Sequence, residues 1–228
     1  MQNITHNYQA ILNKIRLAEK KYHRAPNSVL CLAVSKTFAT EALHPIIAIG
    51  QHEFAENYLQ EALPKISALS GKNLVWHFIG HIQTNKCKEI AYNFSWVHTI
   101  FREKEANQLS MHRPQDLAPL QVCIQIKLDD SASSKNGLLP HEALPLAKHI
   151  SQLPNLKLRG LMAIPPINTD FQQQRQYFKL IRNIGHQLSE AGIELDTYSM
   201  GMTHDLEAAI AEGATIVRVG QGIFGARA

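Results

Sequence analysis

Strand-like and helix-like segments alternate along the whole chain of 228 residues. Eight short apolar runs have the pattern of parallel strands buried on both faces, and they lie at residues 29–35, 52–56, 74–80, 96–100, 120–128, 157–164, 195–200 and 215–220. Helical patterns lie between them, at residues 40–50, 58–69, 85–93, 103–112, 140–153, 171–191 and 204–212. This order predicts a parallel sheet with right-handed crossovers.

The number of strands favours a closed barrel. Eight strands separated by seven helical segments give the count of an α/β fold of the (β/α)₈ type, the TIM barrel. An extra N-terminal helix is expected where apolar residues recur at helical spacing, at Ile4, Tyr8, Ile11, Leu12, Ile15 and Tyr22. An open doubly wound sheet is the alternative, and the absence of a GxGxxG motif after the first strand disfavours it. No linker or low-complexity stretch divides the sequence, so we expect a single domain spanning residues 1–228.

Composition argues against several classes of protein. Charged residues make up 18% of the chain, the formal net charge is +4, and the basic residues are dispersed, which does not favour nucleic-acid binding. The longest apolar run is far shorter than a membrane span, and the amino terminus lacks the apolar core of a signal peptide. Three widely spaced cysteines without a CxxC pair favour a reducing compartment over a disulfide framework. We therefore expect a cytoplasmic protein with no membrane or nucleic-acid partner.

Lys36 is the residue with the clearest capacity for a chemical reaction. It follows the apolar run 29–34 and so lies at the carboxyl end of the first strand, where barrel and open α/β enzymes keep their chemistry. A partly desolvated lysine loses its charge easily, and the neutral amine can attack a carbonyl group to form an imine. The alternative is a structural lysine whose stem packs against the barrel while its ammonium group stays in water.

Two glycine-containing loops predict an anion site at the same end of the barrel. Residues 199–203, Ser-Met-Gly-Met-Thr, precede a helix and offer free backbone amides and hydroxyl groups. Residues 218–225 place three glycines after the eighth strand, which lets backbone amides approach an anion closely. Glycines at strand ends usually serve turns, but barrels commonly hold phosphate in the loops after these two strands.

Arg218 lies within the eighth strand, where it shares one face with Ile216 while Val217 and Val219 share the other. A guanidinium group on a buried face needs a partner. A ligand nitrogen or carboxylate would satisfy it, and so would a structural Asp or Glu side chain.

Two pairs of residues suggest metal ligands, and neither is a strong candidate. His77 and His81 are four residues apart, but on a strand and its exit this spacing covers about 12 Å or more, at about 3.3 Å per residue. Asp129 and Asp130 fall in a polar stretch that predicts a solvated loop. We expect no metal site.

Six short motifs follow one another along nearly the whole chain: Val34-Ser35-Lys36, Phe54-Ala55-Glu56-Asn57-Tyr58, residues 77–86 (His-Phe-Ile-Gly-His-Ile-Gln-Thr-Asn-Lys), Gly160-Leu161-Met162-Ala163-Ile164-Pro165, Ser199-Met200-Gly201-Met202, and residues 218–225. In this order they closely resemble the motifs of the pyridoxal phosphate homeostasis proteins, which are related to the N-terminal domain of alanine racemase. The resemblance implies a (β/α)₈ barrel that carries pyridoxal 5′-phosphate (PLP).

The resemblance also implies roles for individual residues. Lys36 would hold PLP as a Schiff base, Arg218 would face the pyridine nitrogen, and Asn57 would lie near the ring. The phosphate would be held by Ser199, Met200, Gly201, Thr203, Gly220 and Gln221. Three positions depart from the usual family pattern, which has glycine at Ala55, serine at Thr203, and threonine or serine at Gln221. Because Gln221 lacks a hydroxyl group, only its backbone amide is expected to contact phosphate.

The implied function is a non-catalytic role in intracellular PLP (vitamin B6) homeostasis, in which the protein buffers the cofactor or delivers it to apo-PLP enzymes. A guanidinium group opposite the ring nitrogen leaves the electron sink of PLP weak. Alanine racemase works with this arrangement because a tyrosine of the partner subunit and a C-terminal domain complete its site. The sequence ends at Ala228, soon after the eighth strand, and we expect it to lack that domain and to be a monomer.

Two enzymatic hypotheses remain open at this stage. The first is a minimal PLP-dependent amino-acid racemase, for which Tyr58 or Tyr198 would supply the second base. The second is a barrel aldolase that uses Lys36 without a cofactor, and it needs a carboxylate partner at the mouth of the barrel. Glu56 is the plain candidate for that carboxylate.

Overall fold

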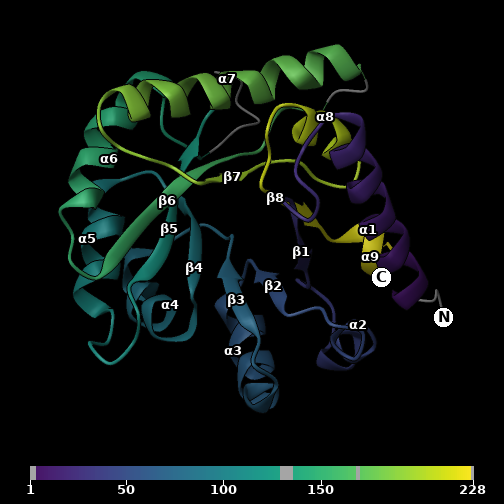
Figure 1. The fold of residues 1–228 in the computed structure, drawn as a ribbon. Helices are drawn as coiled ribbons and strands as arrows, with labels where there is room; N and C mark the ends of the chain where they lie inside the picture. The colour runs from purple at the N-terminus through teal and green to yellow at the C-terminus, as the bar shows by residue number, and fades with distance from the viewer. Residues whose placement is uncertain (1–3, 129–135, 168–169, 227–228) are drawn as a thin grey trace.

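The computed structural model describes residues 4–128, 136–167 and 170–226, and in these ranges eight parallel strands close into a barrel (Figure 1). The strands are β1 (Leu30–Val34), β2 (Glu53–Glu56), β3 (Val75–Phe78), β4 (Trp96–Ile100), β5 (Leu120–Ile126), β6 (Leu156–Ala163), β7 (Thr197–Ser199) and β8 (Ile216–Val219). Each strand pairs with its neighbours in sequence, and β1 pairs with β8 to close the barrel. The (β/α)₈ prediction is confirmed, and each strand ends within two residues of its predicted limits.

Helices surround the barrel: α1 (Ile4–Lys21), α2 (His44–Ile47), α3 (Leu59–Ala68), α4 (Cys87–Asn93), α5 (Glu103–His112), α6 (Ala143–Ser151), α7 (Phe171–Glu190), α8 (Leu206–Ala211) and α9 (Gln221–Phe224). Short 3₁₀ turns occur at η1 (Thr40–Ala42), η2 (Ser70–Lys72), η3 (Thr84–Lys86) and η4 (Pro140–Glu142). No helix among the described residues is both long enough and apolar enough to cross a membrane.

Two helix predictions need correction. The predicted helix at residues 40–50 is divided into η1 and α2, because Pro45 lacks a backbone amide and stands in the first turn of α2. The structure also contains α9, which follows β8 at once and was predicted only as a glycine-rich loop. Its short sequence includes Gly222, and glycine has a low helix propensity, so the pattern gave no helical signal.

The predicted N-terminal helix is present, and it packs beside α8 and α9 from the other end of the chain (Figure 1). The side-chain amide of Asn7 donates a hydrogen bond to the carbonyl of Ile223 at 3.2 Å. Tyr8, Ile11 and Ile15 are buried on the same helix. The first helix therefore holds the segment after β8, which was predicted to bind an anion.

Side chains alternate between two cores along the strands. Cys31 on β1 belongs to the large core between the barrel and the helices, as does Val217 on β8. Leu32 and Ile216 belong to a smaller apolar cluster inside the barrel. Arg218 is buried on the same face as Ile216, as its position in the strand predicts. The barrel interior is thus part apolar and part polar, and this division determines where the site can lie.

Gly160 permits β6 and β7 to lie side by side. A Cβ atom at this position would lie 1.6 Å from the carbonyl oxygen of Thr197 on β7. The clash would be with backbone, which cannot rotate away as a flexible side chain can.

We expect Gly160→Ala to destabilise the barrel by about 1–3 kcal/mol or more, because over-packing forces backbone shifts. The free energy of unfolding, measured by urea denaturation, tests this. Gly71→Ala is the matched control, since a Cβ atom there has no heavy atom within 4 Å. Equal stability of the two variants would contradict the close contact between β6 and β7.

Candidate functional site

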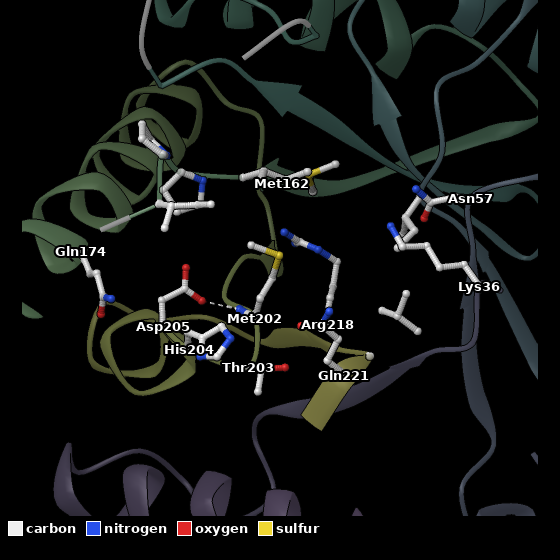
Figure 2. A pocket seen from close by; sticks show the side chains of 17 residues that line it. Lys36, Asn57, Met162, Gln174, Met202, Thr203, His204, Asp205, Arg218 and Gln221 are labelled. Carbon is white, nitrogen blue, oxygen red and sulfur yellow. Dashed lines mark hydrogen bonds between the residues drawn. The ribbon is translucent and has the colours of Figure 1, made fainter. Parts of the chain in front are cut away.

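A cavity of about 340 Å³ opens at the carboxyl ends of the strands (Figure 2). This volume falls in the range of about 300–1,000 Å³ that is typical of small-molecule sites. Among the residues that line it are six of the nine predicted binding residues: Lys36, Asn57, Thr203, Arg218, Gly220 and Gln221. Figure 2 shows Lys36 and Asn57 together on one side of the cavity and Arg218 between them and Asp205.

The alternation of side chains along β1 carries Lys36 into the cavity. Leu32 and Val34 face the barrel interior, and Lys36 continues the same face one step beyond the strand. Thr37 follows with a φ of 68°, a left-handed conformation that is rare for a β-branched residue. Its amide donates a hydrogen bond to Glu61 Oε2 at 2.7 Å. The chain therefore turns sharply just after Lys36 and is held in a costly conformation, a feature that clusters at functional sites.

A buried ion pair lies behind Lys36, between β1, β2 and α3. Lys65 Nζ lies 2.7 Å from Glu56 Oε1 and donates a second hydrogen bond to the carbonyl of Ser35 at 2.8 Å. The Ser35 hydroxyl also donates to Glu56 Oε1, at 2.6 Å. Burial raises the pKa of Glu56, and the hydrogen bonds from Lys65 and Ser35 oppose that rise. The pair joins the ends of two strands at the residue that immediately precedes Lys36.

The orientation of Glu56 removes the basis of the aldolase hypothesis. Its side chain is fully buried toward α3, on the outer face of β2, and it does not line the cavity. Glu56 therefore does not stand at the mouth of the barrel with Lys36.

Asn57 lines the cavity with an unsatisfied acceptor. Its Oδ1 atom is buried and has no hydrogen-bond partner among the described residues. Leaving a buried acceptor unpaired costs about 1–3 kcal/mol, so a ligand donor is expected here. Gly80 allows the backbone after β3 to pass against Asn57, because a Cβ atom there would lie 1.9 Å from the Asn57 carbonyl oxygen.

Arg218 enters the cavity from inside the barrel. Its Nη1 atom donates to the carbonyl and the hydroxyl of Ser199, and its Nη2 atom donates to the carbonyl of Ala163 at 2.9 Å. These bonds engage three of the five guanidinium N–H groups and leave two for a ligand. Burial lowers the pKa of Arg218 to about 10, which the negative charge of Asp205 opposes, so the group remains charged at neutral pH.

The other three predicted residues, Ser199, Met200 and Gly201, do not line the cavity. Ser199 is fully buried, and its side chain contacts Arg218. The amide of Met200 is bonded to the carbonyl of Ile216, and the carbonyl of Gly201 accepts from the amide of Arg218. Gly201 has a φ of 94°, and a Cβ atom there would lie 2.5 Å from that of Ala209. This segment thus supports the loop that carries Thr203.

The two tyrosines considered as a second base also lie outside the cavity. Tyr58 is 55% exposed, and Tyr198 is buried beneath Arg182, whose guanidinium carbon lies 4.3 Å from the ring centroid.

The structure also separates the two candidate metal ligands. His77 is fully buried, whereas His81 is exposed. No group of three or more His, Cys, Asp or Glu side chains in the described ranges is placed to hold a metal ion. Asp129 and Asp130 lie outside the described residues.

Sequence reasoning missed several residues of the cavity, of which Asp205 is the most important. Its Oδ1 atom accepts a hydrogen bond from the amide of Met202 at 2.5 Å. Burial raises the pKa of Asp205, while that hydrogen bond and the charge of Arg218 lower it. An aspartate at the start of a helical pattern is a capping signal and could have drawn attention to this position.

Comparison with known proteins identifies the family. The model of the family described as alanine racemase, N-terminal domain, matches residues 1–228. A pyridoxal phosphate homeostasis protein of Pseudomonas aeruginosa is 47% identical over 227 residues, which cover 100% of this chain and 97% of the relative. The relative of the same name in Escherichia coli K12 is 42% identical over 235 residues, covering 100% of this chain and 98% of the relative. The chain belongs to the pyridoxal phosphate homeostasis protein family. The resemblance seen in the sequence is confirmed.

Solved structures agree with the fold. PipY of Synechococcus elongatus, solved with PLP bound, is 32% identical with a TM-score of 0.82 and covers 92% of this chain and 98% of its own. A protein of Bifidobacterium adolescentis described as unknown has a TM-score of 0.88 at 28% identity, covering 97% of this chain and 94% of its own. Alanine racemase of Clostridium difficile shares the fold, with a TM-score of 0.78 at 13% identity, but only 56% of the racemase is covered.

We expect Lys65→Met to destabilise the protein by about 3–5 kcal/mol, because it leaves the Glu56 carboxylate buried without its partner. Without Lys65 the pKa of Glu56 should rise further above its value in the unfolded chain. A carboxyl group with a raised pKa contributes most to stability at low pH and loses that contribution as pH rises through the folded-state pKa. The deficit relative to the parent should therefore grow as pH rises above the pKa of an unfolded-chain glutamate, about 4.3, as measured by urea unfolding.

The double variant Glu56→Gln, Lys65→Met supplies the control. It has no carboxyl group to titrate at this position, so its own stability should fall less with rising pH than that of Lys65→Met. A pH-independent deficit in Lys65→Met itself would contradict the assignment.

Proposed function

We propose that this chain binds PLP in the cavity as a Schiff base on Lys36 and serves intracellular PLP homeostasis as a single binding domain. One observation carries most of the weight: the amine of Lys36, the guanidinium group of Arg218 and the unpaired Oδ1 of Asn57 belong to one cavity of suitable volume. The presence of PLP in the related PipY structure supports the same assignment.

PLP supplies an aldehyde that combines reversibly with a primary amine, with loss of one water molecule. Lys36 supplies the amine from the end of β1. One of the two N–H groups of Arg218 that are not engaged within the barrel can donate to the lone pair of the pyridine nitrogen. Asn57 Oδ1 accepts a hydrogen bond beside the ring.

The phosphate is assigned to the part of the cavity lined by Thr203, Gly220 and Gln221. The hydroxyl of Thr203 and the backbone amides of the other two residues act as donors to the anion. Ser199, Met200 and Gly201 act indirectly, because their bonds to β8 fix the segment that carries Thr203.

The arrangement favours holding the cofactor over catalysis. Arg218 keeps its proton at neutral pH, so it donates a hydrogen bond to the ring nitrogen without protonating it, and the electron sink stays weak. Tyr58 and Tyr198 lie outside the cavity, which weakens the racemase alternative. At the mouth His204 and Gln221 are exposed to solvent, so the cofactor can leave without opening of the barrel. We infer a monomeric cytoplasmic carrier that buffers PLP and hands it to apo-PLP enzymes, with no nucleic-acid partner.

Lys36→Ala should abolish the Schiff-base absorption band, because the chain then lacks the amine that attacks the aldehyde. In the parent, borohydride reduction followed by peptide mass mapping should place one PLP adduct per chain on the peptide that contains Lys36. Lys86→Ala is the control, since it removes a lysine that does not line the cavity.

An adduct on another lysine, with the band retained in Lys36→Ala, would refute the Schiff-base assignment. The non-catalytic role has its own measurement, chiral analysis after long incubation of the loaded protein with alanine and other amino acids. Turnover near one per second, in the lower range of enzymes, would instead support the racemase hypothesis.

Gly220→Val should release PLP by crowding the phosphate, while Gln221→Ala should have little effect because only the amide of Gln221 is assigned a contact. A charge-assisted hydrogen bond is worth about 1.5–3 kcal/mol, so loss of one should accelerate release about ten- to a hundredfold. Transfer of PLP to an apo-enzyme measures the rate.

Circular dichroism is the folding control for Gly220→Val, because a Cβ atom there would approach the carbonyl oxygen of Val34 to 3.2 Å. If a folded Gly220→Val retains PLP as long as the parent, or if pyridoxal binds as tightly as PLP, the phosphate lies elsewhere.

A further inference from the structure

A continuous line of hydrogen bonds crosses the interior of the barrel from the cavity to its opposite end. Arg218 Nη1 lies 2.9 Å from Ser199 Oγ, which lies 2.8 Å from His98 Nδ1. His98 Nε2 lies 2.9 Å from His77 Nδ1, and His77 Nε2 lies 2.6 Å from Glu53 Oε2. The five side chains come from β8, β7, β4, β3 and β2. We call this line the interior relay.

Hydrogen-bonding capacity gives the interior relay one direction. A guanidinium group can only donate and an ionised carboxylate can only accept, so Ser199 Oγ accepts from Arg218 and Glu53 accepts from His77. With both rings neutral, each ring donates from one nitrogen and accepts at the other, so Ser199 donates to His98 Nδ1. His98 then carries its proton on Nε2 and donates to His77 Nδ1. His77 likewise carries its proton on Nε2 and donates to the carboxylate of Glu53. Both imidazoles are therefore Nε2–H tautomers between a cation and an anion.

The surroundings of the two histidines agree with neutral rings. Burial lowers the pKa of both His77 and His98. The hydrogen bond to Glu53 and the charge of Glu53 oppose the shift at His77, whereas the neighbouring His77 and the charge of Arg218 lower the pKa of His98 further. The Trp96 ring stacks on His77 with centroids 5.4 Å apart, so the chain of polar atoms passes through a packed interior.

Arg218 is a buried cation, and its charge requires compensation by neighbouring polar groups. It is only 4% exposed, and no carboxylate among the described residues is hydrogen-bonded to it. Asp205 acts on it only through its charge. A buried charge is tolerated when neighbouring groups compensate it, and hydrogen bonds in series polarise one another. Glu53 provides an anionic end to that series.

The far end of the relay lies at another surface of the molecule. Glu53 is the first residue of β2, and its side chain is 26% exposed. It lines a second cavity of about 430 Å³ at the amino-terminal ends of the strands, together with Leu30 and Thr215. The residue is therefore separated from the PLP cavity by the length of the barrel interior.

We propose that Glu53 is a positioning residue for Arg218. Acting through His77, His98 and Ser199, its carboxylate fixes the orientation of the guanidinium group, so that the two remaining N–H groups face the cavity. The relay explains why the hydroxyl of Ser199 is directed into the barrel. The predicted effect on PLP rests on the proposed function, whereas the order of protons along the relay does not.

Nitrogen-15 NMR of the labelled full-length chain without cofactor tests the relay directly. His77 and His98 should each show a protonated Nε2 and an unprotonated Nδ1 at neutral pH. A proton on Nδ1 of either ring would overturn the direction of the relay. This measurement needs no variant and does not depend on PLP.

Glu53→Gln tests the positioning role, because it removes the charge and keeps the shape. We expect PLP to dissociate about five- to tenfold faster than from the parent, in the lower range of couplings between sites, with an altered visible circular dichroism of the bound cofactor. Glu41→Gln removes the same charge from an exposed position. It should leave the rate of PLP dissociation and the visible circular dichroism unchanged.

If Glu53→Gln behaves like Glu41→Gln, the positioning role is wrong. Failure of the parent chain to bind PLP would instead refute the proposed function, and the NMR result would still decide whether the relay exists. A Glu53→Gln variant that unfolds would be detected by far-ultraviolet circular dichroism. In that case Glu53→Asp, which retains the charge with a shorter side chain, should retain PLP better than Glu53→Ala, and equal retention would overturn the proposal.

Discussion

One buried positive charge, on Arg218, governs the interior of this barrel. An ion of this kind is strongly destabilising in a packed interior unless acceptors surround it. Here two carbonyl groups and the hydroxyl of Ser199 accept its hydrogen bonds, and the polar side chains of β3 and β4 extend the network away from the cavity. Apolar residues of β1, β2 and β8 fill the other part of the interior. The barrel is therefore asymmetric inside, and its polar part leads to the cavity.

The same alternation that buries Arg218 builds the rest of the site. Residues two apart on a strand share a face, so Lys36 and Asn57 lie above the interior residues Val34 and Ala55. Their strands are joined on the outer face by the buried pair of Glu56 and Lys65. The backbone segments that carry the amine and the amide are thus joined by a contact that does not line the cavity.

Much of this could be predicted from the sequence, because parallel strands buried on both faces give continuous apolar runs and their carboxyl ends converge. The same rule applied to β2 would have placed Glu56 on the outer face with Phe54, although its position at the strand end suggested the mouth. The sequence alone could not predict which side chains of different strands contact one another. The pairing of His77 with His98 depends on β3 and β4 being neighbours, and the bond between Ser199 and Arg218 depends on β7 and β8 being neighbours. Asp205 joins the site only through the course of its loop, which no periodic pattern encodes.

A carrier must retain its cofactor and still release it, and the proposed site divides these tasks among separate groups. Water reverses a Schiff base, so Lys36 alone cannot ensure retention. Contacts to the phosphate and the ring nitrogen would increase the affinity for PLP without a further covalent bond. In the proposed site Arg218 would donate a hydrogen bond and keep its proton, which would strengthen binding without preparing the ring for carbanion chemistry. The position of the cavity at the solvent-exposed mouth then leaves a direct path for exchange. An arginine opposite the ring nitrogen therefore fits the proposed role of a protein that holds the cofactor intact.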